Sequence, residues 1–296
     1  LMPLFFSTLL AASSMQQSQI NPQLLQQRWP AMWITSPTAS TKNYGVFHFR
    51  KRFTLGHKPE QFLVHVSADN RYRLFVNGQF VVHGPARGDL AHWRFESIDL
   101  APYLQAGENV LAAVVWNFAE FMPWAQMTHE TAFIVQGNTE QEAIVNTNKE
   151  WKILQNAAYS PLPVDGRALH AFIVVGPGDR IEAARYPWDW ETNSFDDHAW
   201  RNARELEHGT PREMRDGGSH WMLMPRTIPF MEESLQRIPK IARASGIQPV
   251  KEFLLGKKTL AIPARSTATL LFDQTHLTTA YPELHVSGGK GSAIKL

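Results

Sequence analysis

The feature that most constrains the fold is an alternating stretch that ends in Asn77-Gly78. Between residues 70 and 76, apolar side chains occupy every second position, and these are Tyr72, Leu74 and Val76. A period of two places one set of side chains on each face of a strand. Asn-Gly adopts the two positive φ values of a type I′ turn, so residues 79–83 are expected to return as the partner strand. The stretch therefore predicts an antiparallel β-hairpin.

Further segments of strand length repeat along the first two hundred residues. They are 46–53, 62–68, 110–116, 131–136, 151–154 and 171–175. Residues 110–116 are apolar at nearly every position, which is typical of a strand buried on both faces. Helical periodicity is nearly absent, and only residues 195–200 suit one helical turn. Short strands between Gly, Pro and Asn turns predict an all-β sandwich or jelly roll.

A polar, irregular region between residues 186 and 218, rich in Pro and Gly, divides this pattern. We expect a jelly-roll β-sandwich over 33–210 and a second, smaller β-sandwich over 219–296. The strands expected in the second domain are 227–232, 250–255, 258–262, 267–273, 283–287 and 293–296. Because the last of these ends with the sequence, we expect the second sandwich to be truncated.

Residues 1–20 begin with an apolar run that ends in small residues. This pattern is typical of a secretory signal whose basic start is missing, so we interpret it as a signal-peptide remnant. The run is shorter than the roughly 20 residues that span a bilayer. The alternative is a segment that docks on the core. We expect an exported protein, in the periplasm or at the cell surface, with no membrane span.

Charge and cysteine content exclude several functions. Lys and Arg number 29 and Asp and Glu 27, so the formal charge is 29 − 27 = +2. The longest basic cluster is residues 50–52, so a nucleic-acid partner is not expected. No cysteine is present, which excludes disulfides, thiolate zinc sites and cysteine nucleophiles. His129-Glu130 lacks the second histidine of a zinc helix because position 133 is Phe. We predict no metal and no cofactor.

Saccharide recognition is the chemistry that the aromatic residues favour. The chain has ten tryptophans, and aromatic faces stack on sugar rings. The loop 84–93 combines a guanidinium, a carboxylate, an imidazole and an indole, which suit pairs of hydroxyl groups. The candidate carbohydrate-binding residues are Arg87, Asp89, His92, Trp93, Asn117 and Trp124. The alternatives are that Arg87 and Asp89 pair with each other or with neighbouring loops, and that most tryptophans belong to the core.

No catalytic residue is predicted. The chain has no G-x-S-x-G motif. Asp196 and Asp197 are adjacent, whereas the two carboxylates of a glycosidase face each other across the scissile bond, roughly 5–10 Å apart. Adjacent acids on a turn are more typical of a helix cap.

Five segments in order resemble the N-terminal, non-catalytic region of bacterial secreted α-L-rhamnosidases of glycoside hydrolase family 78. They are 67–78 (SADNRYRLFVNG), 84–89 (GPARGD), 98–110 (IDLAPYLQAGENV), 195–200 (FDDHAW) and 224–229 (MPRTIP). The resemblance runs from about Trp33 to the C-terminus and implies a galactose-binding-like jelly roll. The first and third segments are also similar to the sugar-binding sandwich of β-galactosidase-type enzymes.

The resemblance implies a multidomain exported enzyme that removes terminal L-rhamnose from glycans by inversion. The catalytic acids of that family lie in an (α/α)6 barrel that follows these sandwiches, so no catalytic residue carries over. Some relatives bind rhamnose through a calcium-assisted module, whose ligands we do not match here. The partners implied are rhamnose-containing glycans or other saccharides and the missing C-terminal catalytic domain. The alternatives are a stand-alone carbohydrate-binding module and a structural spacer that docks on the barrel.

Overall fold

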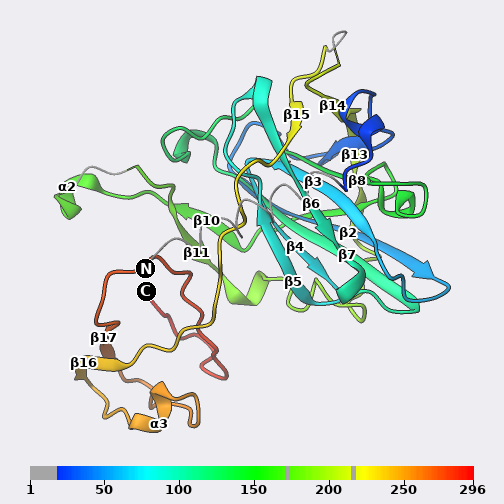
Figure 1. Ribbon diagram of the computed structural model, residues 1–296. Coiled ribbons are helices and arrows are strands. Elements are labelled where there is room, and N and C mark those ends of the chain that lie inside the picture. The colour runs from blue at the N-terminus through cyan, green and yellow to red at the C-terminus, as the bar shows by residue number, and fades with distance from the viewer. Residues whose placement is uncertain (1–18, 171–173, 215–217) are drawn as a thin grey trace, which may run out of the picture. The chain divides into compact units, whose positions relative to one another are not determined.

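The computed structural model describes residues 19–170, 174–214 and 218–296. The chain divides into two units, Leu1–Pro229 and Phe230–Leu296 (Figure 1). Residues 1–18 of the segment interpreted as a signal remnant lie outside the described residues. The first three residues of the strand predicted at 171–175 also lie outside them. Val174 and Val175 are not in a strand.

The described part of the first unit contains two main sheets. One has seven strands in the order β13 (Arg204–His208), β1 (Met32–Thr35), β8 (Ala132–Gly137), β3 (Leu63–Asp69), β6 (Trp93–Asp99), β15 (Met222–Pro225) and β14 (Thr210–Pro211). The other has six, in the order β12 (Arg201–Asn202), β9 (Lys152–Gln155), β2 (Gly45–Leu55), β7 (Gly107–Asn117), β4 (Arg71–Val76) and β5 (Gln79–Gly84). β10 (Tyr159–Leu162) and β11 (Gly178–Ile181) form a separate hairpin.

The predicted hairpin is confirmed as β4 and β5. Asn77 and Gly78 have φ values of 51° and 84°, as a type I′ turn requires. The Asn77 side chain also accepts a hydrogen bond from the Val110 amide at 2.9 Å. The turn is therefore fixed both by its own backbone and by β7, the strand next to β4.

A single core lies between the two main sheets. Side chains of β3 and β8 in one sheet pack with those of β2, β4 and β7 in the other. The bulkiest members with less than 2 % exposure are Phe47, Phe49, Phe62, Tyr72, Phe133 and Trp151. The first unit is therefore the predicted β-sandwich.

A second apolar layer covers the outer face of each sheet. Trp29, Trp33 and Trp221 belong to a cluster with β6 and β8 on the seven-stranded sheet. Trp190 and Trp200 pack with Val46, Ala112 and Val114 on the six-stranded sheet. The predicted burial of residues 110–115 on both faces is confirmed, because β7 has the core on one side and these tryptophans on the other.

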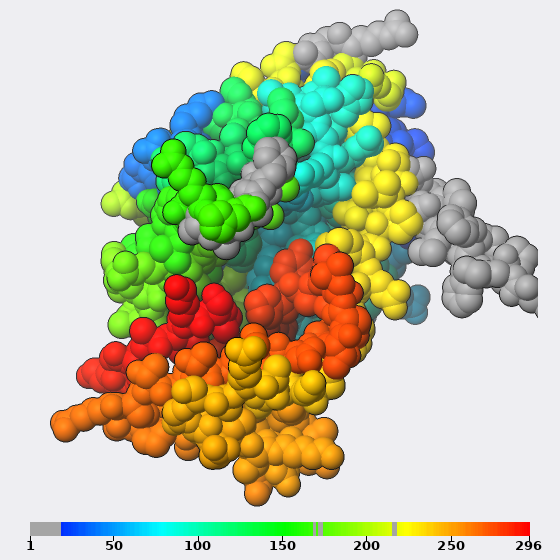
Figure 2. All heavy atoms as spheres, turned by 90° about the vertical axis from the view of Figure 1, so that its left-hand side faces the viewer, coloured from blue at the N-terminus to red at the C-terminus, as the bar shows by residue number. Residues whose placement is uncertain are grey.

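The second unit differs from the sequence prediction. Residues 230–296 form one antiparallel pair, β16 (Lys240–Ser245) with β17 (Thr269–Asp273), and the helix α3 (Lys251–Leu254), in place of a second sandwich. The strand predicted at 250–255 is wrong, since α3 occupies it. Every residue of this unit is at least partly exposed, and its atoms are the gold to red spheres of Figure 2. The predicted domain limits 210 and 219 also change, because β15 pairs with β6 and belongs to the first unit.

The described helices are short. They are α2 (Gly166–Leu169), α3, and the 3-10 helices η1 (Pro22–Leu25), η2 (Leu90–His92), η3 (Ala101–Tyr103), η4 (Ala119–Phe121), η5 (Ala143–Val145) and η6 (Ala183–Arg185). In the described part of the chain, none has the length and apolar character needed to cross a bilayer. Residues 195–200 form turns where one helical turn was predicted.

Candidate saccharide-binding rim

Arg87 and Trp124, two of the candidate residues, meet at one rim of the sandwich. Arg87 follows β5, and its Nη1 donates a hydrogen bond to the Trp124 carbonyl oxygen at 3.1 Å. The Trp124 amide donates to the Val174 carbonyl oxygen, also at 3.1 Å. The Trp124 side chain is 66 % exposed. An exposed indole beside a guanidinium combines an apolar face with a hydrogen-bond donor.

The loop that carries Trp124 is held at its start by two buried asparagines. Asn70 Oδ1 accepts a hydrogen bond from the Phe118 amide at 2.9 Å. Asn117 Oδ1 accepts from the Ala119 amide at 2.9 Å. These bonds satisfy amides at the point where β7 ends, so the loop leaves the sheet in one fixed direction.

A buried carboxylate, Asp69, holds the other end of this loop. Its oxygens accept hydrogen bonds from the Thr128 hydroxyl and the His129 amide, each at 2.6 Å, and from Trp221 Nε1 at 3.0 Å. Burial raises the pKa of Asp69, and these donors oppose that rise. Sequence reasoning quoted Asp69 only as part of segment 67–78 and assigned it no role. Its structural importance depends on donors that are up to 152 positions away.

Asp89 and His92 interact with each other and not with Arg87. Asp89 Oδ1 accepts a hydrogen bond from the Ala91 amide at 2.8 Å and so caps η2. His92 Nδ1 lies 2.9 Å from the same oxygen. The bond to His92 lowers the pKa of Asp89. Arg87 and Asp89 therefore do not pair with each other. Arg87 binds the neighbouring loop that carries Trp124, and Asp89 orders its own loop.

Burial removes Trp93 and Asn117 from the candidate surface. Trp93 is 2 % exposed, because it begins β6 and packs in the cluster on the outer face of the seven-stranded sheet. Asn117 is also 2 % exposed, and its Nδ2 donates to the Thr41 carbonyl oxygen and to Thr131 Oγ1. Sequence reasoning placed Trp93 in a loop because residues 84–93 are polar and contain Gly and Pro. Neither side chain presents a face to a ligand.

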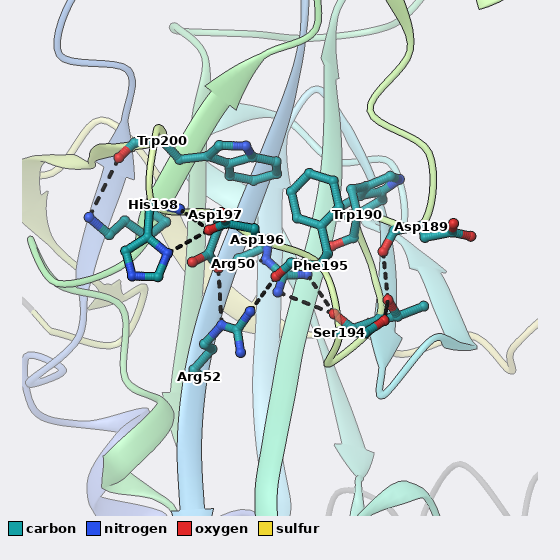
Figure 3. A network of polar contacts seen from close by, with 12 residues as sticks. Arg50, Arg52, Asp189, Trp190, Ser194, Phe195, Asp196, Asp197, His198 and Trp200 are labelled. Carbon is teal, nitrogen blue, oxygen red and sulfur yellow. Dashed lines mark hydrogen bonds and ion pairs between the residues drawn. The ribbon is translucent and has the colours of Figure 1, made fainter.

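The segment 195–200 contains the densest polar network of the six-stranded sheet (Figure 3). Asp197 Oδ2 accepts hydrogen bonds from Arg50 Nε at 2.8 Å and from Arg52 Nε at 3.4 Å. Arg50 also donates to the carbonyl oxygens of Trp190 and Thr192. The network therefore fixes residues 190–197 against β2.

Asp196 and Asp197 have different structural roles. Asp196 is exposed, and its Oδ1 accepts from the His198 amide at 3.0 Å, so it caps a turn where the sequence indicated a helix cap. The Arg50 side chain is fully buried against Asp197. A buried arginine needs such a partner, because an unpaired charge in the interior is strongly unfavourable. The Arg50–Asp197 pair holds residues 190–197 against β2.

A hollow with a volume of about 120 Å³ is lined by residues of β2 and β7 together with Asn193. None of the six candidate residues lines it. Among the residues that the structure describes, no group of three or more His, Asp and Glu side chains is arranged to hold a metal ion.

The fold and the rim together define a β-sandwich with an exposed aromatic and a guanidinium on one edge. Of the solved structures, a family 78 rhamnosidase of Bacillus sp. GL1 is similar, with 24 % identity and a TM-score of 0.63. The similarity covers 75 % of this chain and 22 % of that chain. The sequence-based resemblance to this family is thus matched by a shared sandwich fold, and the chain spans about a fifth of that enzyme.

Two other solved structures are more distant. An α-L-rhamnosidase from Dictyoglumus thermophilum has 17 % identity and a TM-score of 0.46 over 73 % of this chain and 23 % of that chain. A lectin from Pleurotus ostreatus has 17 % identity and a TM-score of 0.39 over 62 % of this chain and 43 % of that chain. No family model matches the sequence, and no curated protein does.

Proposed function

We propose that this chain is the N-terminal, non-catalytic β-sandwich region of an α-L-rhamnosidase-like glycoside hydrolase. The observation that carries the proposal is the shared fold with the Bacillus rhamnosidase, of which the match covers 22 %. The five ordered sequence segments support the same family. Hydrolysis of terminal α-L-rhamnosides then belongs to a catalytic domain outside these residues, and that domain is the chain's main partner.

An activity assay on the purified chain tests the non-catalytic assignment. We expect no release of aryl alcohol from an aryl α-L-rhamnoside above the uncatalysed rate. Mutating the exposed Asp196 provides the control for a trace contaminant, since contaminating activity would not depend on it and the Arg50–Asp197 pair stays intact. Turnover that copurifies with the chain and disappears on mutation of Asp196 would overturn the proposal.

The exposed Trp124 favours a second function, carbohydrate binding by the sandwich itself. Its indole is two-thirds exposed, and its backbone is fixed by Arg87 and by the anchored loop. A rigid aromatic platform with an adjacent donor suits a saccharide ring. The ligand class is rhamnose-containing glycans or other saccharides.

Titration calorimetry with L-rhamnose, galactose and oligosaccharides tests this second function. We expect weak binding that Trp124→Ala abolishes and Arg87→Ala reduces several-fold. Trp188→Ala is the matched control, because Trp188 is 61 % exposed but does not belong to the rim. Absence of heat with every saccharide, or equal losses for Trp124→Ala and Trp188→Ala, would rule the binding site out.

The second unit favours a third function, that of a spacer covered by another domain. Exposed large apolar side chains are frequent over 271–296, and they are Leu271, Phe272, Leu277, Tyr281, Leu284, Val286, Ile294 and Leu296. A high density of exposed apolar side chains is a feature of interaction sites. In the proposed enzyme, the catalytic domain would cover it.

We also propose that the protein is exported. The support is the apolar run followed by small and polar residues at the start of the sequence. Fractionation of the producing cells tests it, with the protein expected outside the cytoplasm.

A further inference from the structure

A fully buried carboxylate, Glu96, lies between the candidate rim and the end of the first unit. It belongs to β6 and has no exposed surface. Its Oε2 accepts a hydrogen bond from the Tyr72 hydroxyl at 2.8 Å. Its Oε1 accepts from the Ala86 amide at 2.8 Å and from Arg226 Nη1 at 3.3 Å. One oxygen atom is therefore shared by two segments that are 140 positions apart.

Ala86 is the residue that immediately precedes Arg87. The backbone reaches the carboxylate here because residue 84 is glycine. A Cβ atom at Gly84 would collide with the Glu96 carboxylate and with the Tyr72 ring. The path of the rim loop after β5 is thus set by close approach to Glu96.

Arg226 holds the segment through which the chain leaves the first unit. Its Nε donates to the Ile228 carbonyl oxygen at 2.9 Å, and its Nη2 donates to the Pro229 carbonyl oxygen at 2.8 Å. The second unit begins at the next residue, Phe230. A single guanidinium therefore joins Glu96 to the last two carbonyl groups before that unit. This gives the segment 224–229 a role that its sequence alone did not reveal.

The charge of Glu96 links the two segments energetically. Burial raises the pKa of Glu96, and the Ala86 amide, the Tyr72 hydroxyl and Arg226 all act in the opposite direction. A buried carboxylate that loses its cation becomes an uncompensated charge, and its remaining hydrogen bonds reorganise. Disturbance of Arg226 therefore affects the Ala86 amide, because both groups donate to the same Glu96 oxygen.

We propose that Glu96 couples the loop that carries Arg87 to the exit segment 226–229, so that the order of one depends on the other. The carboxylate is a positioning group for both segments. A change at the rim is transmitted to the chain that leads into the second unit, and the reverse also holds, as any energetic coupling is reciprocal.

Amide hydrogen exchange tests the coupling, because the Ala86 amide itself donates to the shared oxygen. In Arg226→Lys the positive charge remains, but the planar guanidinium that donates hydrogen bonds to Glu96, Ile228 and Pro229 is lost. We expect about tenfold faster exchange at the Ala86 amide and at the amide of residue 226, which donates to the Phe95 carbonyl oxygen at 2.9 Å. Glu96→Gln keeps the shape of the side chain and removes its charge, so it is expected to accelerate exchange at the same two amides if Arg226→Lys does not fold.

Arg94→Lys is the matched control. Arg94 Nη1 donates to the Pro225 carbonyl oxygen at 3.1 Å, next to Arg226, and makes no bond to Glu96. This variant is expected to leave Ala86 exchange unchanged. Faster exchange confined to the amide of residue 226 in Arg226→Lys would overturn the proposal. Equal acceleration of Ala86 in Arg94→Lys would also overturn it, since the effect would then be general loosening.

Discussion

Asp197 is the residue on which the packing of the six-stranded sheet's outer layer depends most. Asp197→Asn removes the charge that pairs with the fully buried Arg50. We expect the free energy of unfolding to fall by about 3 kcal/mol, because an uncompensated cation remains in the interior. Chemical denaturation measures this change. Asp196→Asn is the neighbouring control, and it is expected to leave stability nearly unchanged because Asp196 is exposed. Equal effects of the two variants would contradict the structural role of Asp197.

The lowered pKa of His48 predicts how the free energy of unfolding depends on pH. It is fully buried, its Nε2 accepts a hydrogen bond from Asn156 Nδ2 at 2.8 Å, and burial lowers its pKa to about 3. Below the unfolded-state pKa of about 6.5, the unfolded chain binds a proton that the folded chain does not. This residue's contribution to stability is thus complete above pH 6.5 and decreases as the pH falls toward 3.

Comparison with His48→Gln isolates this effect from other titrating groups. Between pH 7 and pH 5, we expect the unfolding free energy of the unchanged protein to fall by about 2 kcal/mol more than that of the variant. Urea denaturation at both pH values provides the measurement. If the unfolding free energies of the two proteins fell equally between pH 7 and pH 5, His48 would bind its proton equally in the folded and unfolded chain. That result would contradict the lowered pKa.

At the scale of elements, the turn between β4 and β5 needs two consecutive residues at positive φ. Gly78→Ala places a side chain at a φ of +84° and should destabilise the protein by about 1–2 kcal/mol. Gly56→Ala is the control, because Gly56 does not require a positive φ and a Cβ atom there has open space. Thermal unfolding compares the two. An equal loss of stability in the two variants would contradict the positive φ of Gly78.

Strands with a strong local pattern could be predicted from sequence, and those that depend on distant partners could not. β4, β5 and β7 have alternating or continuous apolar residues and an Asn-Gly turn, so their positions were predicted closely. β15 was missed as part of the first unit because residues 222–225 become a strand only beside β6. α3 replaced a predicted strand because apolar runs of about five residues do not distinguish helix from strand.

The residues of the candidate site could likewise be predicted only in part. Arg87 and Trp124 were both selected from sequence, and the fold brings them together. Trp93 was selected for its polar surroundings, yet residues 93–99 form a strand that buries it. Glu96 and Asp69 were not selected, because their donors are distributed over the whole first unit. Local composition carries no signal for such long-range carboxylate contacts.

At the scale of the whole molecule, the two units differ in how much surface they bury. The first has a continuous core between two sheets, and the second has no buried residue. Because apolar burial provides most of the stability of a fold, the second unit should not be stable by itself. We expect trypsin to cleave within residues 230–296 at least tenfold faster than within the sandwich, with mass spectrometry locating the cuts. Equal resistance of both units would contradict this difference.

Immunodepletion tests the assignment to a rhamnosidase-like enzyme most directly. An antibody against the folded first unit is added to extracts and culture medium of the producing organism, and α-L-rhamnosidase activity is measured before and after its removal. We predict that the activity decreases together with a polypeptide several times larger than this chain. Removal of a polypeptide of about 33.6 kDa with the rhamnosidase activity unchanged would contradict the assignment.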